Sequence, residues 1–171
     1  MENTVIVDSS LILLAIIGGW MLGNIMYRNR QTPVSWFTLF LVNFAALWCM
    51  FNWIAHVIAV LAVNVQRIMA GSFVYTFPFY AMLLMGITFI ALSVLQLSRI
   101  RQLSQGKHYL RKQLTLVSWS IVALSLPIVP LNPIGLLPVI SSVIILATVS
   151  LTKSQWKPAA FQEHSNTIVS A

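Results

Sequence analysis

The chain has 171 residues, of which 58% are hydrophobic and only 8% charged, whereas an average soluble domain has about 25% charged residues. Ten Lys and Arg residues outnumber three Asp and Glu residues, and the charges lie between long apolar stretches, not inside them. This pattern excludes a soluble globular domain and predicts an all-α integral membrane protein. The single cysteine, Cys49, excludes an internal disulfide and a cysteine-rich metal site.

Five apolar stretches are predicted to cross the bilayer as helices, because hydrocarbon offers backbone N–H and C=O groups no outside partner. They cover residues 9–27, 33–65, 77–97, 109–127 and 132–151. Together they define a five-helix transmembrane domain over residues 1–152, followed by a short cytoplasmic tail over 153–171. The N-terminal region is acidic and lacks the basic segment of a cleavable signal peptide, so the first stretch is expected to be retained.

Capping residues suggest where these helices begin. The candidates are Asp8, Ser9 or Ser10 for the first stretch, Thr32 followed by Pro33 for the second, and Thr76 for the third. The second stretch would form a helix about 50 Å long, whereas the hydrocarbon is about 30 Å thick. We therefore expect this helix to tilt, kink or project beyond the bilayer.

The basic residues divide unequally between the two sides of the predicted membrane. One side carries Arg28, Arg30, Arg99, Arg101, Lys107, Arg111, Lys112, Lys153 and Lys157. The other side carries only Arg67, together with the acidic N-terminus. Because Lys and Arg are enriched in cytoplasmic loops, this bias predicts an external N-terminus and a cytoplasmic C-terminus in the cell membrane.

A polar face runs along the second stretch. Thr38, Ala45, Cys49, Asn52, His56 and Ala59 lie within about 80° of one another on a helical wheel. Polar groups facing lipid are costly, so this face should contact protein or a hydrated cavity. Interhelical hydrogen bonding is the favoured interpretation, and a solute path or redox-ligand site is the alternative. No second histidine lies within a stretch, which excludes a bis-histidine haem in one chain.

Two further patterns concern how the helices pack. Gly18, Gly19 and Gly23 give the first stretch a GxxxG spacing, which lets two helix backbones approach closely, either within the chain or between subunits. Four prolines, Pro127, Pro130, Pro133 and Pro138, separate the last two stretches. The favoured interpretation is a tight outer hairpin with a kinked helix start, and the alternative is broken backbone at membrane depth. The apolar character of this segment indicates a re-entrant position or a covering partner.

The segment 98–113 is basic and contains no acidic residue. Arg99, Arg101, Lys107, Arg111 and Lys112 are predicted to orient the chain and to contact anionic lipid headgroups. Gly106 is expected to separate two helix extensions. Nucleic acid is not an expected partner, because no aromatic stacking motif accompanies the charges.

Chemical motifs are missing from the sequence. The three carboxylates, Glu2, Asp8 and Glu163, lie near the ends, so none is within a span for proton transfer or metal binding. No catalytic, cofactor-binding or metal-ligating residue is predicted. The leading prediction is a non-catalytic multi-pass subunit that packs against a protein partner or forms a homo-oligomer to scaffold, assemble or regulate a complex. The alternative is a small homo-oligomeric pore for a neutral or anionic solute, and an accessory chain of a lipid- or quinone-linked enzyme is the third hypothesis.

Overall fold

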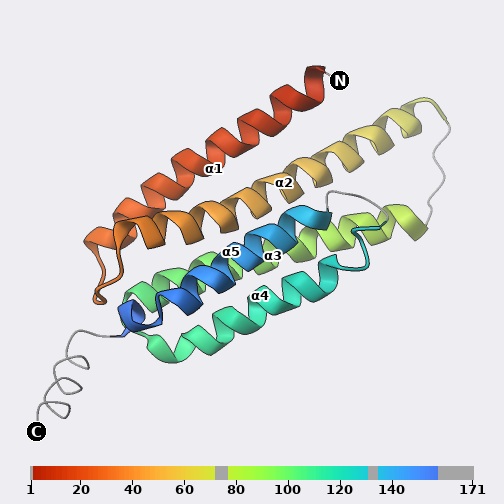
Figure 1. Cartoon of the computed structure of the whole chain (residues 1–171). Coiled ribbons are helices and arrows are strands. Elements are labelled where there is room, and N and C mark those ends of the chain that lie inside the picture. The colour runs from red at the N-terminus through yellow and green to blue at the C-terminus, as the bar shows by residue number, and fades with distance from the viewer. Residues whose placement is uncertain (1, 72–76, 131–134, 158–171) are drawn as a thin grey trace, which may run out of the picture.

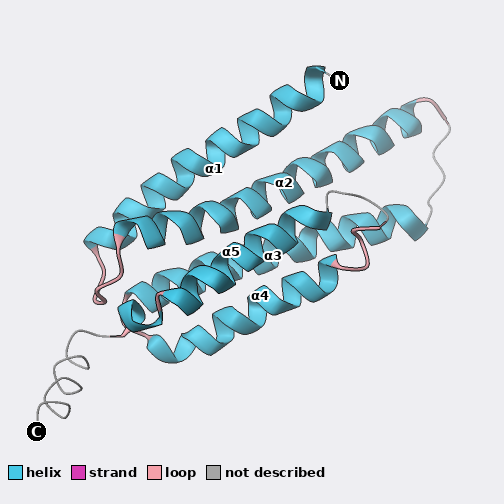
Figure 2. Cartoon of the chain, in the orientation of Figure 1, coloured by secondary structure: helices cyan, strands magenta, loops and turns pink. Residues whose placement is uncertain are grey.

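The computed structural model describes residues 2–71, 77–130 and 135–157. Within these ranges the chain forms helices joined by turns, and no strand is present (Figure 2). The α-helices are α1 (Glu2–Arg28), α2 (Trp36–Met69), α3 (Phe77–Ser104), α4 (Arg111–Ser125) and α5 (Leu136–Leu151), with short 3₁₀ helices η1 (His108–Leu110) and η3 (Lys153–Trp156). The predicted all-helical fold is therefore confirmed for the described part of the chain.

In the described part of the chain, three helices are long and apolar enough to cross a membrane. They cover Ser9–Arg28, Trp36–Met69 and Phe79–Ser104. The α5 helix is apolar but has only 16 residues, and α4 has 15, whereas a full span needs about 20. The last two predicted stretches are thus shorter as helices than expected.

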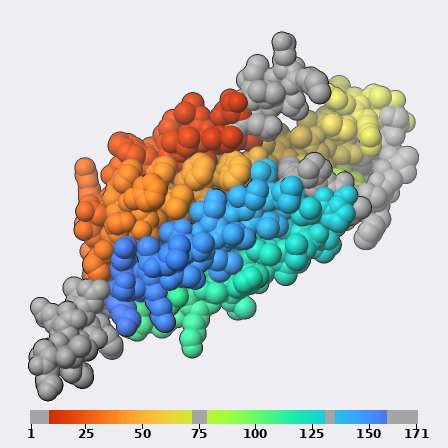
Figure 3. All heavy atoms as spheres, in the orientation of Figure 1, coloured from red at the N-terminus to blue at the C-terminus, as the bar shows by residue number. Residues whose placement is uncertain are grey.

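The α2 helix lies at the centre of the structure. It packs against α1, α3 and α5, while α4 packs against α3 and α5. The α1 helix contacts α2 along its length and touches α3 only slightly. In Figure 3 the helix α1 accordingly lies at one edge of the visible face. The fold is a four-helix bundle, α2 to α5, with α1 added to its side (Figure 1).

The interior of the four-helix bundle contains two clusters of buried side chains. One includes Val42, Ile100, Leu114, Ile145 and Val149, and the other includes Cys49, Phe89, Val117 and Ile121. The rings of Trp53 and Phe89 stack between α2 and α3 with 4.5 Å between their centroids. These contacts fix the relative position of the four helices.

The helix starts differ from those predicted by capping residues. The N-cap of α2 is Ser35, whose Oγ accepts a hydrogen bond from the backbone N–H of Thr38 at 3.1 Å. Thr32 is not the cap, because its hydroxyl instead donates to the carbonyl of Ser104 at 3.2 Å. The α1 helix already begins at Glu2, so residues 8–10 lie inside it. Thr76 lies outside the described residues.

The α3 helix continues beyond the predicted end of its apolar stretch, to Ser104. Long basic side chains allow this extension, because they reach water while their stems stay along the helix. Gly106 then has a φ of 85°, a left-handed conformation that favours glycine, and it ends the α3 extension before η1 and α4. The predicted role of Gly106 as a separator is confirmed.

The three described prolines near the ends of α4 and α5, Pro127, Pro130 and Pro138, do not interrupt the middle of a helix. The α4 helix ends at Ser125, two residues before Pro127, and Pro130 lies in the turn that follows. The α5 helix covers Leu136–Leu151, so Pro138 lies in its first turn, where a missing N–H costs no hydrogen bond. At this position Pro138 leaves the hydrogen bonds of α5 intact. Pro133 lies outside the described residues.

Candidate functional site

The glycines of α1 lie against α2 of the same chain. A Cβ atom built on Gly19 would be 2.9 Å from the Cα of Phe44, and one on Gly23 would be 3.3 Å from the Cα of Phe40. At Gly18 the nearest atom is the end of the Leu47 side chain, at 2.8 Å. The two helices thus run antiparallel with their backbones in close approach, which forms a glycine seam. This seam is not available to a separate partner chain.

The opposite side of α1 is apolar and faces outward. Among the large side chains on this side, five with 47–57% of their surface exposed are Leu13, Leu14, Ile17, Met21 and Ile25. Beside α1, the rings of Trp36, Phe40, Phe44 and Trp48 form a stacked ladder along α2, with centroid separations of 5.5, 6.1 and 6.0 Å. These rings are only partly buried. We call the five exposed α1 residues the α1 outer face.

The predicted polar face of α2 points mostly into the protein. Thr38, Cys49 and Asn52 are buried, and His56 is partly buried. The amide of Asn52 donates to the Trp48 carbonyl at 2.8 Å. The ring of His56 packs edge-on against Trp53 with 5.3 Å between the centroids. No hydrogen bond joins Asn52 to His56 in this part of the structure, so the spacing that brings them together does not make them a bonded pair.

A buried polar contact that sequence analysis missed joins α3 to α4. The amide Nε2 of Gln96 donates to the Oγ of Ser118 at 2.9 Å, and both residues have no exposed surface. Ser93, Ser141 and Ser142 are also buried, and among the described residues the hydroxyls of Ser141 and Ser142, like the Gln96 Oε1 atom, have no hydrogen-bond partner. The i, i+3 spacing of Ser93 and Gln96 in an apolar stretch is the signal that could have indicated a second polar helix face.

Replacing Ser118 by alanine should destabilise the fold by about 0.6–1.7 kcal/mol, the range measured for polar contacts between membrane helices. The reason is that the buried Gln96 amide loses its partner. In a double-mutant cycle, Ser118→Ala should cost little in a Gln96→Leu background. Equal costs in both backgrounds, measured by detergent unfolding, would show that the hydrogen bond does not stabilise the fold.

Nine of the ten basic residues lie at one end of the structure. Hydrogen bonds join the segments there, among them Gln31 N–H to the Ser104 carbonyl at 2.9 Å, the Thr32 hydroxyl to the same carbonyl, and Ser35 N–H to Gln155 Oε1 at 3.4 Å. They bring together the end of α1, the start of α2, the end of α3 and η3 (Figure 1). We call this region the basic end. Arg67 lies near the opposite end of α2.

The predicted lipid-contact residues occupy the basic end. Arg101, Lys107 and Lys112 are exposed, while Arg99 is partly buried and donates to Gln102 Oε1 at 3.1 Å. Arg111 and Lys112 line a cavity of about 550 Å³ beside His108 and Tyr109. The arrangement gives a positively charged surface suited to phosphate groups.

The described residues do not assemble a metal-binding cluster: no group of three or more His, Cys, Asp or Glu side chains comes together there. Comparisons with protein families, curated proteins and solved structures found no match for this chain. Its class is therefore defined by its own features: an all-helical chain with three helices long and apolar enough to span a membrane.

Proposed function

We propose that the protein is an integral protein of the cell membrane, with α1, α2 and α3 crossing the bilayer and the basic end in the cytoplasm. The positive-inside rule supports this orientation, because nine Lys and Arg residues gather at one end and one lies at the other. The N-terminus is then external and the C-terminal tail cytoplasmic. The α2 helix, at 34 residues, is unbroken and extends about 50 Å, so it tilts or projects beyond the hydrocarbon.

The α4–α5 pair is proposed to enter the membrane from the basic end and to turn inside the hydrocarbon. The two helices are about 22 and 24 Å long, less than the about 30 Å of hydrocarbon. The turn has no charged residue, its prolines have no N–H to satisfy, and the N–H groups of Leu126, Ile128 and Val129 are bonded within the chain. Five complete spans, with this turn at the far interface, are the alternative.

Within this membrane the protein is proposed to act as a non-catalytic subunit that packs against partner helices to scaffold, assemble or regulate a complex. The observation that carries the proposal is the position of α1. This helix packs on the bundle almost entirely through α2 and presents the α1 outer face along its other side. A second copy of the chain and a different protein are both suitable partners, and no cofactor is proposed.

Cysteine crosslinking tests this function. In a Cys49→Ala background, Ile17→Cys in native membranes should crosslink to a partner, and blue-native electrophoresis should show a complex larger than the monomer. Val94→Cys is the matched control, because Val94 is similarly exposed on α3. Recovery of the protein only as a monomer, with equally low crosslinking at both positions, would contradict the proposal.

The alternative function, a small homo-oligomeric pore, is favoured by the polar interior between α2, α3, α4 and α5. Gln96, Ser93, Ser141 and Ser142 extend the polar face that begins with Asn52. A pore predicts that Asn52→Leu or His56→Leu abolishes solute flux into liposomes. Unchanged flux in both variants would exclude these residues from the path.

A further inference from the structure

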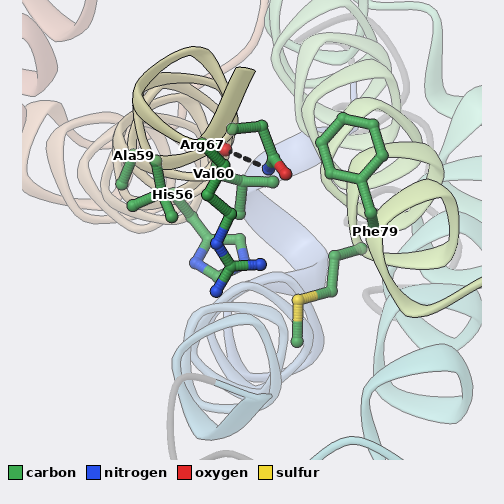
Figure 4. Close-up of a pocket in the computed structure, with 8 residues that line it drawn as sticks. His56, Ala59, Val60, Arg67 and Phe79 are labelled. Carbon is green, nitrogen blue, oxygen red and sulfur yellow. Dashed lines mark hydrogen bonds between the residues drawn. The ribbon is translucent and has the colours of Figure 1, made fainter. Parts of the chain in front are cut away.

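A groove lies between the far halves of α2 and α3. It exists because the α4–α5 pair is shorter than α2 and α3 and stops well before their loop-side ends (Figure 1). The groove encloses about 330 Å³ and is lined by His56, Ala59, Val60, Val63, Asn64 and Arg67 from α2 and by Phe79 and Met82 from α3. In Figure 4 the side chains of His56 and Arg67 project from α2 to the same side, and Phe79 comes from α3.

The groove is apolar along its length and cationic near its outer end. Its walls are formed by Val60, Val63, Phe79 and Met82. The amide of Asn64 donates to the Val60 carbonyl at 2.6 Å, so its polar group is partly satisfied within the helix. Arg67 is exposed and is the only charged residue of the sequence between Arg30 and Arg99. It lies about 16 Å along the helix axis from His56.

We propose that this groove binds an anionic phospholipid from the outer leaflet, with its phosphate at Arg67 and an acyl chain along the groove toward His56. The proposal rests on the membrane placement given above, but it does not depend on a partner protein. A guanidinium forms paired hydrogen bonds with phosphate oxygens, which fixes a headgroup more precisely than a general attraction to the surface. The apolar walls then hold the chain of the same molecule.

The residues that line the groove favour an anionic phospholipid over other classes of ligand. A small water-soluble anion would leave the valine, phenylalanine and methionine walls without a partner, because such walls are stabilised by apolar contact. A cationic amphiphile would be repelled by Arg67. An uncharged lipid would contact the apolar walls but would form no ion pair with the Arg67 guanidinium. The charge of the headgroup should therefore decide which lipid binds more tightly.

Native mass spectrometry of the purified full-length protein tests the site. The protein in mild detergent is titrated with phosphatidylglycerol or with phosphatidylcholine that has the same acyl chains. Arg67→Gln should weaken binding of phosphatidylglycerol about tenfold or more, the loss expected when a charge-assisted hydrogen bond is removed. Arg67→Lys should retain most of the preference, and Met82→Trp, which fills the groove, should weaken binding of both lipids.

The matched control is Arg28→Gln, because Arg28 is exposed at the basic end and lies away from the groove. This variant should keep the affinity of the wild-type protein for phosphatidylglycerol. Equal affinity of the wild-type protein for both lipids would overturn the proposal, as would a preference for phosphatidylglycerol that is as strong in Arg67→Gln as in the wild-type protein. Blue-native electrophoresis of the same samples reports complex formation separately, so a monomer that keeps the Arg67-dependent preference would contradict only the proposed subunit function.

Discussion

Gly19→Ala should destabilise the fold by about 1–3 kcal/mol, the cost of adding a methyl group to a well-packed contact. The new Cβ would lie 2.9 Å from the Cα of Phe44, and a backbone atom cannot move aside as the end of a side chain can. The helix α1 would have to shift away from α2, and the outer face proposed for partner contact would shift with it. Unfolding in mixed micelles of increasing sodium dodecyl sulfate measures the change.

Gly18→Ala is the control for this substitution. Both changes bring the same gain in helix propensity, but the Cβ at position 18 meets only the flexible end of Leu47. The loss of stability at position 18 should therefore be smaller. The loss caused by Gly23→Ala, where the contact is 3.3 Å, should lie between those caused by Gly18→Ala and Gly19→Ala. Equal stability of the three variants would show that the seam does not hold α1 in place.

The second large effect is expected at the turn between α4 and α5. In a Cys49→Ala background, a cysteine at Leu126 should resist a membrane-impermeant maleimide added to either side of sealed membranes, although 58% of the Leu126 surface is exposed in the protein itself. The reason is that the proposed re-entrant arrangement places the turn in hydrocarbon, where a thiol meets neither water nor the reagent and does not ionise. After solubilisation in detergent, the maleimide labelling of this cysteine is compared with the labelling of a cysteine at the exposed position Met69.

Comparing the labelling of the α4–α5 turn with that of the loop end of α2 distinguishes a re-entrant pair from five complete spans. Met69, 83% exposed at the loop end of α2, should react from the outside in sealed membranes. Rapid external labelling at both Leu126 and Met69 would mean that α4 and α5 are complete spans and that the chain crosses the membrane five times. Protection of Leu126 alone would support three spans and a re-entrant pair.

Composition and helix length made much of the fold predictable. The apolar stretches form helices in the described residues. Gly106, which interrupts the basic segment, has a φ of 85° and separates α3 from η1 and α4, as its position in the sequence predicted. Helix ends were less predictable, because tertiary contacts decided them. Thr32 is a good capping residue in isolation, but the carbonyl at the end of α3 takes its hydroxyl, and Ser35 caps α2 instead. Pro138 lies in the first turn of α5, where proline is tolerated, and sequence spacing alone did not locate this helix start.

The site was predictable only in part. The periodicity of α2 placed Thr38, Cys49 and Asn52 on one buried face, but it gave no information about their neighbours on other helices. The Gln96–Ser118 hydrogen bond depends on the register of α3 against α4, and the groove at Arg67 depends on where α4 and α5 end. Both features depend on how different helices are placed against one another, and the periodicity of one helix gives no information about that placement.

The most direct test of membrane placement is the sidedness of the two ends of the bundle. Single cysteines at Met69 and at Lys107, both exposed, are labelled in sealed right-side-out membranes with the impermeant maleimide. The proposed orientation predicts that Met69→Cys reacts at once, whereas Lys107→Cys reacts only after the membrane is permeabilised. Immediate labelling of Lys107→Cys, with Met69→Cys protected until permeabilisation, would place the basic end outside the cell and contradict the proposed threading of every helix.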